Sequence, residues 1–183
     1  MRAAASTLRI GARAVAVCAV AAAMLAGPTQ ASAGGGCSGA NANPNGVSLA
    51  AARSATLCIL NQQRRAHGLR PLRENGDLSL ASQRHANSMS DHKYFAHGDF
   101  VGRIRAAHYL HGAGGWTLGE NIAWGSWEYA TPASIVDSWM HSPPHRSVIL
   151  NGGFHDLGIG ISYGFPGRGS HGATFTVDFG SRN

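Results

Sequence analysis

Three absences in the sequence narrow the functional classes open to it. It has no stripe of Lys and Arg interleaved with aromatic residues, which a groove that follows a nucleic-acid strand would need. The uncharged apolar run over residues 14–26 is much shorter than the roughly 20 residues required to cross a bilayer. No internal repeat is evident either. We therefore expect neither a nucleic-acid partner nor a transmembrane anchor in the mature protein.

The first 33 residues have the pattern of a secretory signal peptide. Arg2, Arg9 and Arg13 precede the apolar run, and the small-residue sequence Ala31-Ser32-Ala33 follows it. We expect cleavage after Ala33 and a protein that is secreted, either extracellular or associated with the cell wall. Cleavage removes three arginines, so the formal charge of +6 for the whole chain falls to +3.

Cysteine is scarce, and its positions favour one disulfide. Cys18 lies in the segment predicted to be removed, which leaves Cys37 and Cys58 as a pair in an oxidising compartment. A bond between them would hold a flexible Gly- and Asn-rich leader, residues 34–47, against a single domain over residues 48–183. Lipidation of Cys37 is the alternative, but the apolar residue expected shortly before a lipidated cysteine is missing.

The first half of that domain has helical patterns. Ser48 can cap a helix that continues to Gly68. A second helix is predicted over residues 77–90, where His85 lies on the apolar side and is expected to be a hydrogen-bonded core residue. A third, shorter helix is predicted over residues 101–108. These elements form the helical part of the fold.

The second half changes to a strand pattern. Thr131-Pro132 predicts the start of another helix, which Pro143-Pro144 should end. Large apolar residues alternate with small or polar ones over residues 157–163 and again over 173–179, as in two strands of an antiparallel hairpin. Helices first and a hairpin last predict an α+β fold.

Short segments along the mature chain resemble, in wording and order, the CAP superfamily (cysteine-rich secretory protein, antigen 5 and pathogenesis-related 1) in its short bacterial SCP-domain form. They include Tyr94-Phe95-Ala96-His97, Gly119-Glu120-Asn121-Ile122-Ala123-Trp124, and the stretch from Trp139 to Arg146. The segments over residues 60–72 and 81–89 and the two closing strands extend the resemblance. It implies a three-layer α-β-α sandwich with a small antiparallel sheet, to which the stretch near Ile122 would add a strand.

The resemblance also implies a cleft lined by two histidines and usually two acidic residues. By matching motifs, His97 and His145 take the histidine positions, and Glu120 takes the first acidic position. The second acidic residue would follow Trp139, where the sequence has no carboxylate, so the set is incomplete.

His97 and His145, with Glu120 acting directly or through water, could hold Zn²⁺ or another divalent metal with an open coordination position. Our leading hypothesis is an extracellular, monomeric binding module whose ligand is a lipid, a cell-wall component or an extracellular protein. The alternatives are a metal-assisted hydrolase of peptides or esters, and a structural wall or stress protein with a vestigial cleft. No residue is assigned a catalytic role.

Two catalytic motifs occur in the wrong context. His141 and His145 have the spacing of a zincin helix, but the two prolines between them forbid that helix and the required Glu is absent. The sequence over residues 160–164 matches a nucleophile elbow, yet a Gly/Pro loop follows where a helix is required. Neither motif supports a hydrolase.

Other polar and aromatic residues have structural explanations. Asn61 and Arg64 are predicted to tie the first helix to a neighbouring loop, and Asn121 to bond the backbone. Glu120 could equally satisfy backbone donors in a tight loop. Most tryptophans are core candidates, with one or two at the mouth of a cleft. Six further histidines are expected on loops or the surface: His67, His92, His108, His111, His155 and His171.

Overall fold

The structure is a computed structural model that describes residues 36–164 and 171–183. The predicted signal peptide, residues 1–33, lies outside these residues and stays a prediction. In the described part of the chain, no helix is both long and apolar enough to cross a membrane.

The first two helices begin and end close to the predicted residues. α1 (Leu49–Ala66) starts after Ser48, whose hydroxyl accepts the N–H of Ala51 at 3.1 Å. α2 (Gly76–His92) is capped by Asn75 and ends at Lys93 in the left-handed conformation. The predicted third helix is α3 (Phe100–Ala106).

Four strands form one sheet in the order β1-β3-β4-β2. The strands are β1 (Arg73–Glu74), β2 (Trp116–Ser126), β3 (Asp156–Tyr163) and β4 (Gly172–Arg182). β3 and β4 pair antiparallel, which confirms the predicted hairpin, and β2 pairs antiparallel with the other side of β4. β1 is a two-residue strand parallel to β3, and the sequence pattern did not predict it. β2 is also longer than the short strand expected near Ile122.

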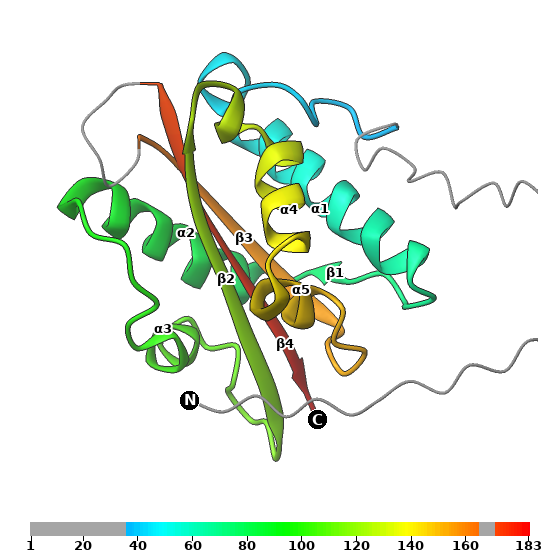
Figure 1. The fold of residues 1–183 in the computed structure, drawn as a ribbon. Coiled ribbons are helices and arrows are strands. Elements are labelled where there is room, and N and C mark those ends of the chain that lie inside the picture. Colours follow the sequence, from blue (N-terminus) through cyan, green and yellow to red (C-terminus); the bar gives the residue numbers. More distant parts are fainter. Residues whose placement is uncertain (1–35, 165–170) are drawn as a thin grey trace, which may run out of the picture. The chain divides into compact units, whose positions relative to one another are not determined.

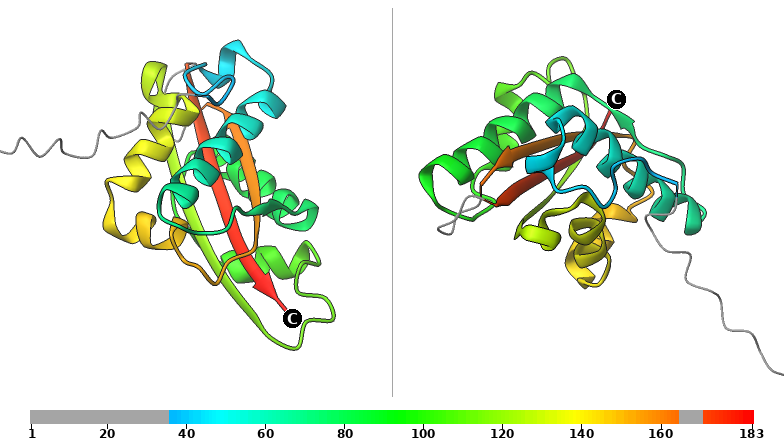
Figure 2. Two further views of the ribbon diagram at one scale, coloured as in Figure 1. Left: turned by 90° about the vertical axis from the view of Figure 1, so that its right-hand side faces the viewer. Right: turned by 90° about the horizontal axis from the view of Figure 1, so that it is seen from above.

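Helices cover both faces of the sheet, as Figures 1 and 2 show. α2 packs on β3 and β4, with α3 beside it, while α1, α4 (Pro132–Met140) and α5 (Pro143–Ile149) cover the other face. An added Cβ would come within 2.0 Å of the α2 backbone at Gly158 and within 2.2 Å at Gly160. The absence of a side chain at these two glycines therefore lets α2 pack closely on β3. The arrangement is the predicted three-layer α-β-α sandwich.

The main core lies between the sheet and the α1, α4 and α5 layer. Trp139 is 1% exposed within it, but Trp116, Trp124 and Trp127 are 46%, 45% and 60% exposed. The prediction that most tryptophans lie in the core was therefore wrong. Trp116 and Trp127 stand at the two ends of the edge strand β2, where few side chains can cover them.

The two prolines after α4 have a second effect that the sequence reading missed. α4 ends at Met140, in agreement with the prediction, but Pro143 also begins α5. A proline in the first turn of a helix loses no hydrogen bond, because the N–H groups there have no helical partner. His141 and His145 therefore belong to different elements, which agrees with the rejection of a zincin helix.

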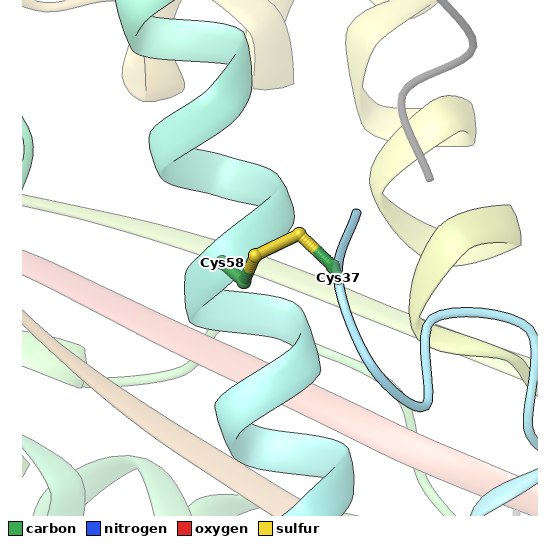
Figure 3. The surroundings of a disulfide bond; sticks show 2 residues. All are labelled: Cys37 and Cys58. Carbon is green, nitrogen blue, oxygen red and sulfur yellow. A yellow bond between two sulfur atoms is a disulfide. The ribbon is translucent and has the colours of Figure 1, made fainter. Parts of the chain in front are cut away.

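The predicted Cys37–Cys58 disulfide is present, with the two Cα atoms 5.8 Å apart (Figure 3). It joins the described part of the leader, residues 36–47, to α1. Ala40 is buried there and accepts a hydrogen bond from the N–H of Ala133 at 2.9 Å. In this part the leader packs on the domain.

Arg64 and Asn61 tie α1 to neighbouring loops, as predicted. Arg64 is 1% exposed and donates to four backbone carbonyls, those of Arg70, Ile149, Asn151 and Phe154. Asn61 bonds both the N–H and the carbonyl of Leu72. These bonds fix the end of α5 and the segment that leads into β3 relative to α1.

Candidate functional site

His97 lies on the loop after α2, and neighbouring side chains hold its backbone. The buried His85 donates from Nε2 to the carbonyl of Ala96 at 3.0 Å, which confirms the predicted hydrogen-bonded core role of His85. Arg103 of α3 donates from Nη1 to the carbonyl of His97 at 2.8 Å. The His97 side chain is nevertheless 51% exposed. The loop is therefore fixed while the imidazole reaches solvent.

Glu120 on β2 contacts both His97 and Arg103. Its Oε1 lies 2.8 Å from Nδ1 of His97, and its Oε2 lies 2.6 Å from Nη2 of Arg103. The Glu120 side chain is only 1% exposed. Because an ionised carboxylate only accepts hydrogen bonds, Nδ1 of His97 carries the ring proton and Nε2 is the acceptor nitrogen of the ring.

Asp178 on β4 is a second buried acidic residue at this position. It pairs with Glu120 in the β2–β4 register and is 1% exposed. The Ser82 hydroxyl of α2 donates to its Oδ2 at 2.7 Å. The sequence reading found no second carboxylate after Trp139, and the structure instead places this one on the neighbouring strand. We call His97, Arg103, Glu120, Asp178 and Ser82 the His97 network.

The two carboxyl groups are neighbours in a buried setting and interact electrostatically, which favours a proton on one of them. Burial, together with the charge of Glu120, raises the pKa of Asp178 well above its usual value. Burial also raises the pKa of Glu120, but the adjacent Arg103 opposes that shift. We assign the proton to Asp178, because Glu120 has two partners that favour its ionised form.

His145 lies on α5, at the other side of the edge strand. Its Nδ1 is 2.8 Å from the Ser142 hydroxyl, and its carbonyl accepts from Nδ2 of Asn121 at 3.0 Å. Burial lowers the pKa of His145, and the charge of His97 lowers it further. The two imidazoles therefore interact electrostatically, although His145 makes no hydrogen bond to His97 or Glu120.

His97 has the same preference for the neutral form. Burial and the charge of Arg103 lower its pKa, while Asp178 raises it. The pKa of both ligand candidates thus lies below that of a free imidazole. Both shifts favour the uncharged ring, which is the form that binds a metal or accepts a proton.

Two surface hollows are lined by described residues outside the His97 network. The larger has a volume of about 610 Å³ and borders α4 and α5; its lining residues are Met140, His141, Pro143, Arg146, Ser147 and Leu150. The smaller, about 180 Å³, is lined by residues around Arg70 and His155. Neither is lined by His97, Glu120 or His145, so the cleft expected around these residues stays a prediction.

The side chains that could act as metal ligands decide which kind of metal site could form here. Both Glu120 oxygens already accept hydrogen bonds, from His97 and Arg103, so a metal would compete with these partners for Glu120. Within residues 36–164 and 171–183, no group of three or more His, Cys, Asp or Glu side chains is placed to hold a metal ion. A site of two imidazoles, in which Glu120 orients His97 as an outer partner, stays a prediction.

Arg103 and Asp178 were missed for different reasons. Arg103 lies on a short helix with a weak pattern, and nothing in its sequence context marks it. Asp178 stands between Val177 and Phe179 in a strand whose two faces are both covered. A carboxylate at such a position was a usable signal, because buried acids need a partner.

Comparison with known sequences agrees with the fold. The profile of the cysteine-rich secretory protein (CAP) family matches residues 57–179. The chain is 33% identical over 114 residues to the uncharacterized protein YkwD of Bacillus subtilis (strain 168), covering 62% of this chain and 43% of YkwD. It is 28% identical over 110 residues to the uncharacterized membrane protein YlbC of the same organism, covering 57% and 30%. The chain thus spans less than half of each of these relatives.

Solved structures show the same fold at low sequence identity. An extracellular protein of Bacillus anthracis that contains an SCP domain matches with a TM-score of 0.57 and 21% identity, covering 73% of this chain and 43% of that one. An outer surface protein of Borrelia burgdorferi matches with a TM-score of 0.62 and 18% identity, covering 75% and 97%. The family profile covers most of the chain, and the sandwich agrees with it: this protein belongs to the cysteine-rich secretory protein (CAP) family.

Proposed function

We propose that the protein is an extracellular, monomeric binding module whose ligand contacts the Nε2 atoms of His97 and His145. The supporting observation is the bond between Nδ1 of His97 and the buried Glu120 at 2.8 Å. This bond fixes one tautomer and leaves Nε2 as the acceptor nitrogen of a ring that is 51% exposed. The Ser142 hydroxyl holds Nδ1 of His145 at the same distance of 2.8 Å.

Two uncharged imidazoles with anchored Nδ1 atoms suit a divalent metal such as Zn²⁺, or a ligand that offers hydrogen-bond donors. A bound metal would supply a Lewis acid and a positive charge at this surface. The chain itself orients the His97 ring, because Glu120 bonds its Nδ1 and Arg103 bonds Glu120. Besides a metal ion, we propose a larger ligand, a lipid or a cell-wall component, in keeping with the predicted secretion.

Calorimetric titration of the tag-free mature protein with ZnCl₂ tests the metal-binding part. We expect one saturable site in the wild type and its loss in His97→Ala and in His145→Ala. His141→Ala is the matched control, because His141 is 74% exposed and four residues from His145 but outside the proposed pair. Binding that survives both alanine variants would show that the metal goes elsewhere.

Binding to purified wall fragments and to lipid vesicles tests the larger ligand. Retention that depends on His97 and His145 supports the module. If the wild type binds none of these probes and no metal, the binding proposal is wrong.

The same geometry favours a second candidate, a metal-assisted hydrolase of peptides or esters. A carboxylate that holds Nδ1 of a histidine is the arrangement that prepares Nε2 to accept a proton. This candidate predicts an activity that a chelator abolishes, Zn²⁺ restores and Glu120→Gln removes. Activity that is indifferent to all three treatments would count against it.

A further inference from the structure

Trp127, at the far end of β2 from Trp116, is held in an unusual and exposed position. It is the first residue of the 3-10 turn η2 (Trp127–Ala130), and its side chain is 60% exposed. Its φ of 53° lies in the left-handed region, which a bulky aromatic residue rarely adopts. A conformation of this kind persists only where the surroundings impose it.

Three parts of the chain fix this turn. The N–H of Trp127 donates to the carbonyl of His171 at 2.8 Å, and its carbonyl accepts from Nδ2 of Asn43 at 2.6 Å. An added Cβ at Gly125 would lie 2.1 Å from the carbonyl oxygen of Tyr129, so the glycine lets η2 fold back on β2. Figure 1 shows the described part of the leader (blue) beside this end of the sheet.

The indole of Trp127 is supported on one face only. The His171 imidazole lies parallel to it, with ring centroids 4.2 Å apart and an interplanar angle of 6°. Since one face is covered and the side chain is still 60% exposed, the other face is open to solvent. We call these two stacked rings the Trp127 platform.

The described segments around the platform carry no Lys or Arg side chain. Residues 43–47, 124–134 and 171–174 contain no Lys or Arg. Glu128 and Tyr129 of the same turn are exposed, Tyr129 by 68%. Anionic lipids and nucleic acids are bound through Lys and Arg, so both are poor ligands for this surface. A neutral sugar ring suits it, because its C–H groups stack on an electron-rich indole and its hydroxyls can donate to a carboxylate.

We propose that the Trp127 platform is a saccharide-binding site, separate from the His97 network. The open indole face stacks on the apolar face of a neutral hexose ring, and Glu128 accepts hydrogen bonds from its hydroxyls. The strained turn keeps the indole presented to solvent before the ligand arrives. This site goes beyond the proposed function, because it uses none of the residues of the His97 network.

NMR titration of the mature protein with the N-acetylglucosamine trimer, followed through the indole N–H signals, tests the proposal. We expect saturable shifts of the Trp127 signal in the wild type. Trp127→Asn should weaken binding at least about tenfold, since it removes a stacking contact of roughly 1.4 kcal/mol. Asn tolerates the left-handed conformation, so this variant should fold at least as stably as the wild type. Trp127→Phe keeps a ring and should retain most of the affinity.

Matched controls separate this site from others. Trp116→Ala removes a tryptophan of similar exposure, 46%, at the other end of β2 and should leave trimer binding unchanged. His97→Ala should also leave it unchanged, which distinguishes the platform from the His97 network. Equal binding by the wild type and Trp127→Asn, or no saturable binding of the trimer or of cellotriose, would overturn the proposal. So would Trp127-dependent binding to phosphatidylglycerol vesicles or Trp127-dependent dimerisation in sedimentation, each of which would assign the platform to another partner.

Discussion

Replacing Arg103 by Met tests the electrostatic design of the His97 network. The Glu120 side chain is 1% exposed, and Arg103, itself 23% exposed, is its cationic partner at 2.6 Å. Removing the guanidinium leaves a buried carboxylate without that partner, which costs about 3–5 kcal/mol in a fully buried pair. Because Arg103 is partly exposed and His97 stays on Oε1, we expect a loss near the lower limit, about 3 kcal/mol. Urea unfolding at pH 7 measures it, provided that the slope against urea stays unchanged.

The pH dependence of that loss gives a second check. Without Arg103 the folded-state pKa of Glu120 rises further above its unfolded value. An acid with a raised folded pKa favours the folded state at low pH and loses that contribution as pH rises through the folded pKa. The difference between Arg103→Met and the wild type should therefore be smaller at pH 5 than at pH 8.

A double-mutant cycle measures the coupling energy between Arg103 and Glu120. Glu120→Gln removes the charge that Arg103 neutralises, so the double variant Arg103→Met/Glu120→Gln should be more stable than the sum of the two single losses predicts. A loss below about 1 kcal/mol in Arg103→Met, equal at both pH values and additive with Glu120→Gln, would refute the reasoning, because exposed ion pairs behave in that way.

Three further predictions follow from the packing and the buried acid. Asp178→Asn mimics the neutral acid, so the stability of this variant relative to the wild type should increase as pH rises from about 4 to 7. Unfolding at several pH values measures the difference in stability. A difference that does not change with pH would show that Asp178 is ionised. Gly160→Ala places a Cβ 2.2 Å from the Ser82 backbone and should cost about 2–3 kcal/mol in urea unfolding, whereas Gly46→Ala meets nothing within 4 Å and should change stability by less than about 0.5 kcal/mol. Cys37→Ser/Cys58→Ser opens a disulfide of sequence separation 21 and should lower thermal stability by about 3 kcal/mol; an unchanged melting temperature would contradict it.

The helices and the hairpin could be predicted because their signals are local. Ser48 and Thr131 each mark a helix start by the type of side chain alone, and both side chains make the expected cap. The alternation over residues 173–179 likewise reports a strand without knowledge of its partners. α5 and β1 were missed since each is short, and β1 exists only through its pairing with β3.

The site was only partly predictable, because it depends on which residues meet across the sheet. Glu120 and Asp178 are 58 positions apart, and only the β2–β4 register makes them neighbours. A strand shifted by one residue would turn Asp178 to the other face. Motif order could suggest His97 and Glu120, but it held no information on Arg103, which decides the charge of the carboxylate.

The partners of the Glu120 carboxylate determine what the site can bind. Arg103 and His97 bond its two oxygens, and the raised pKa of Asp178 favours the neutral form of the neighbouring acid. An incoming cation therefore meets imidazole nitrogens at this site, and no carboxylate that lacks other partners. Such a donor set binds a divalent metal more weakly than a site of three or four protein ligands. It follows that Glu120 serves chiefly to orient His97, and that an Arg103→Met variant, in which one Glu120 oxygen is released, should bind Zn²⁺ more tightly than the wild type in calorimetry. Weaker or equal binding by that variant would show that the carboxylate does not limit the affinity.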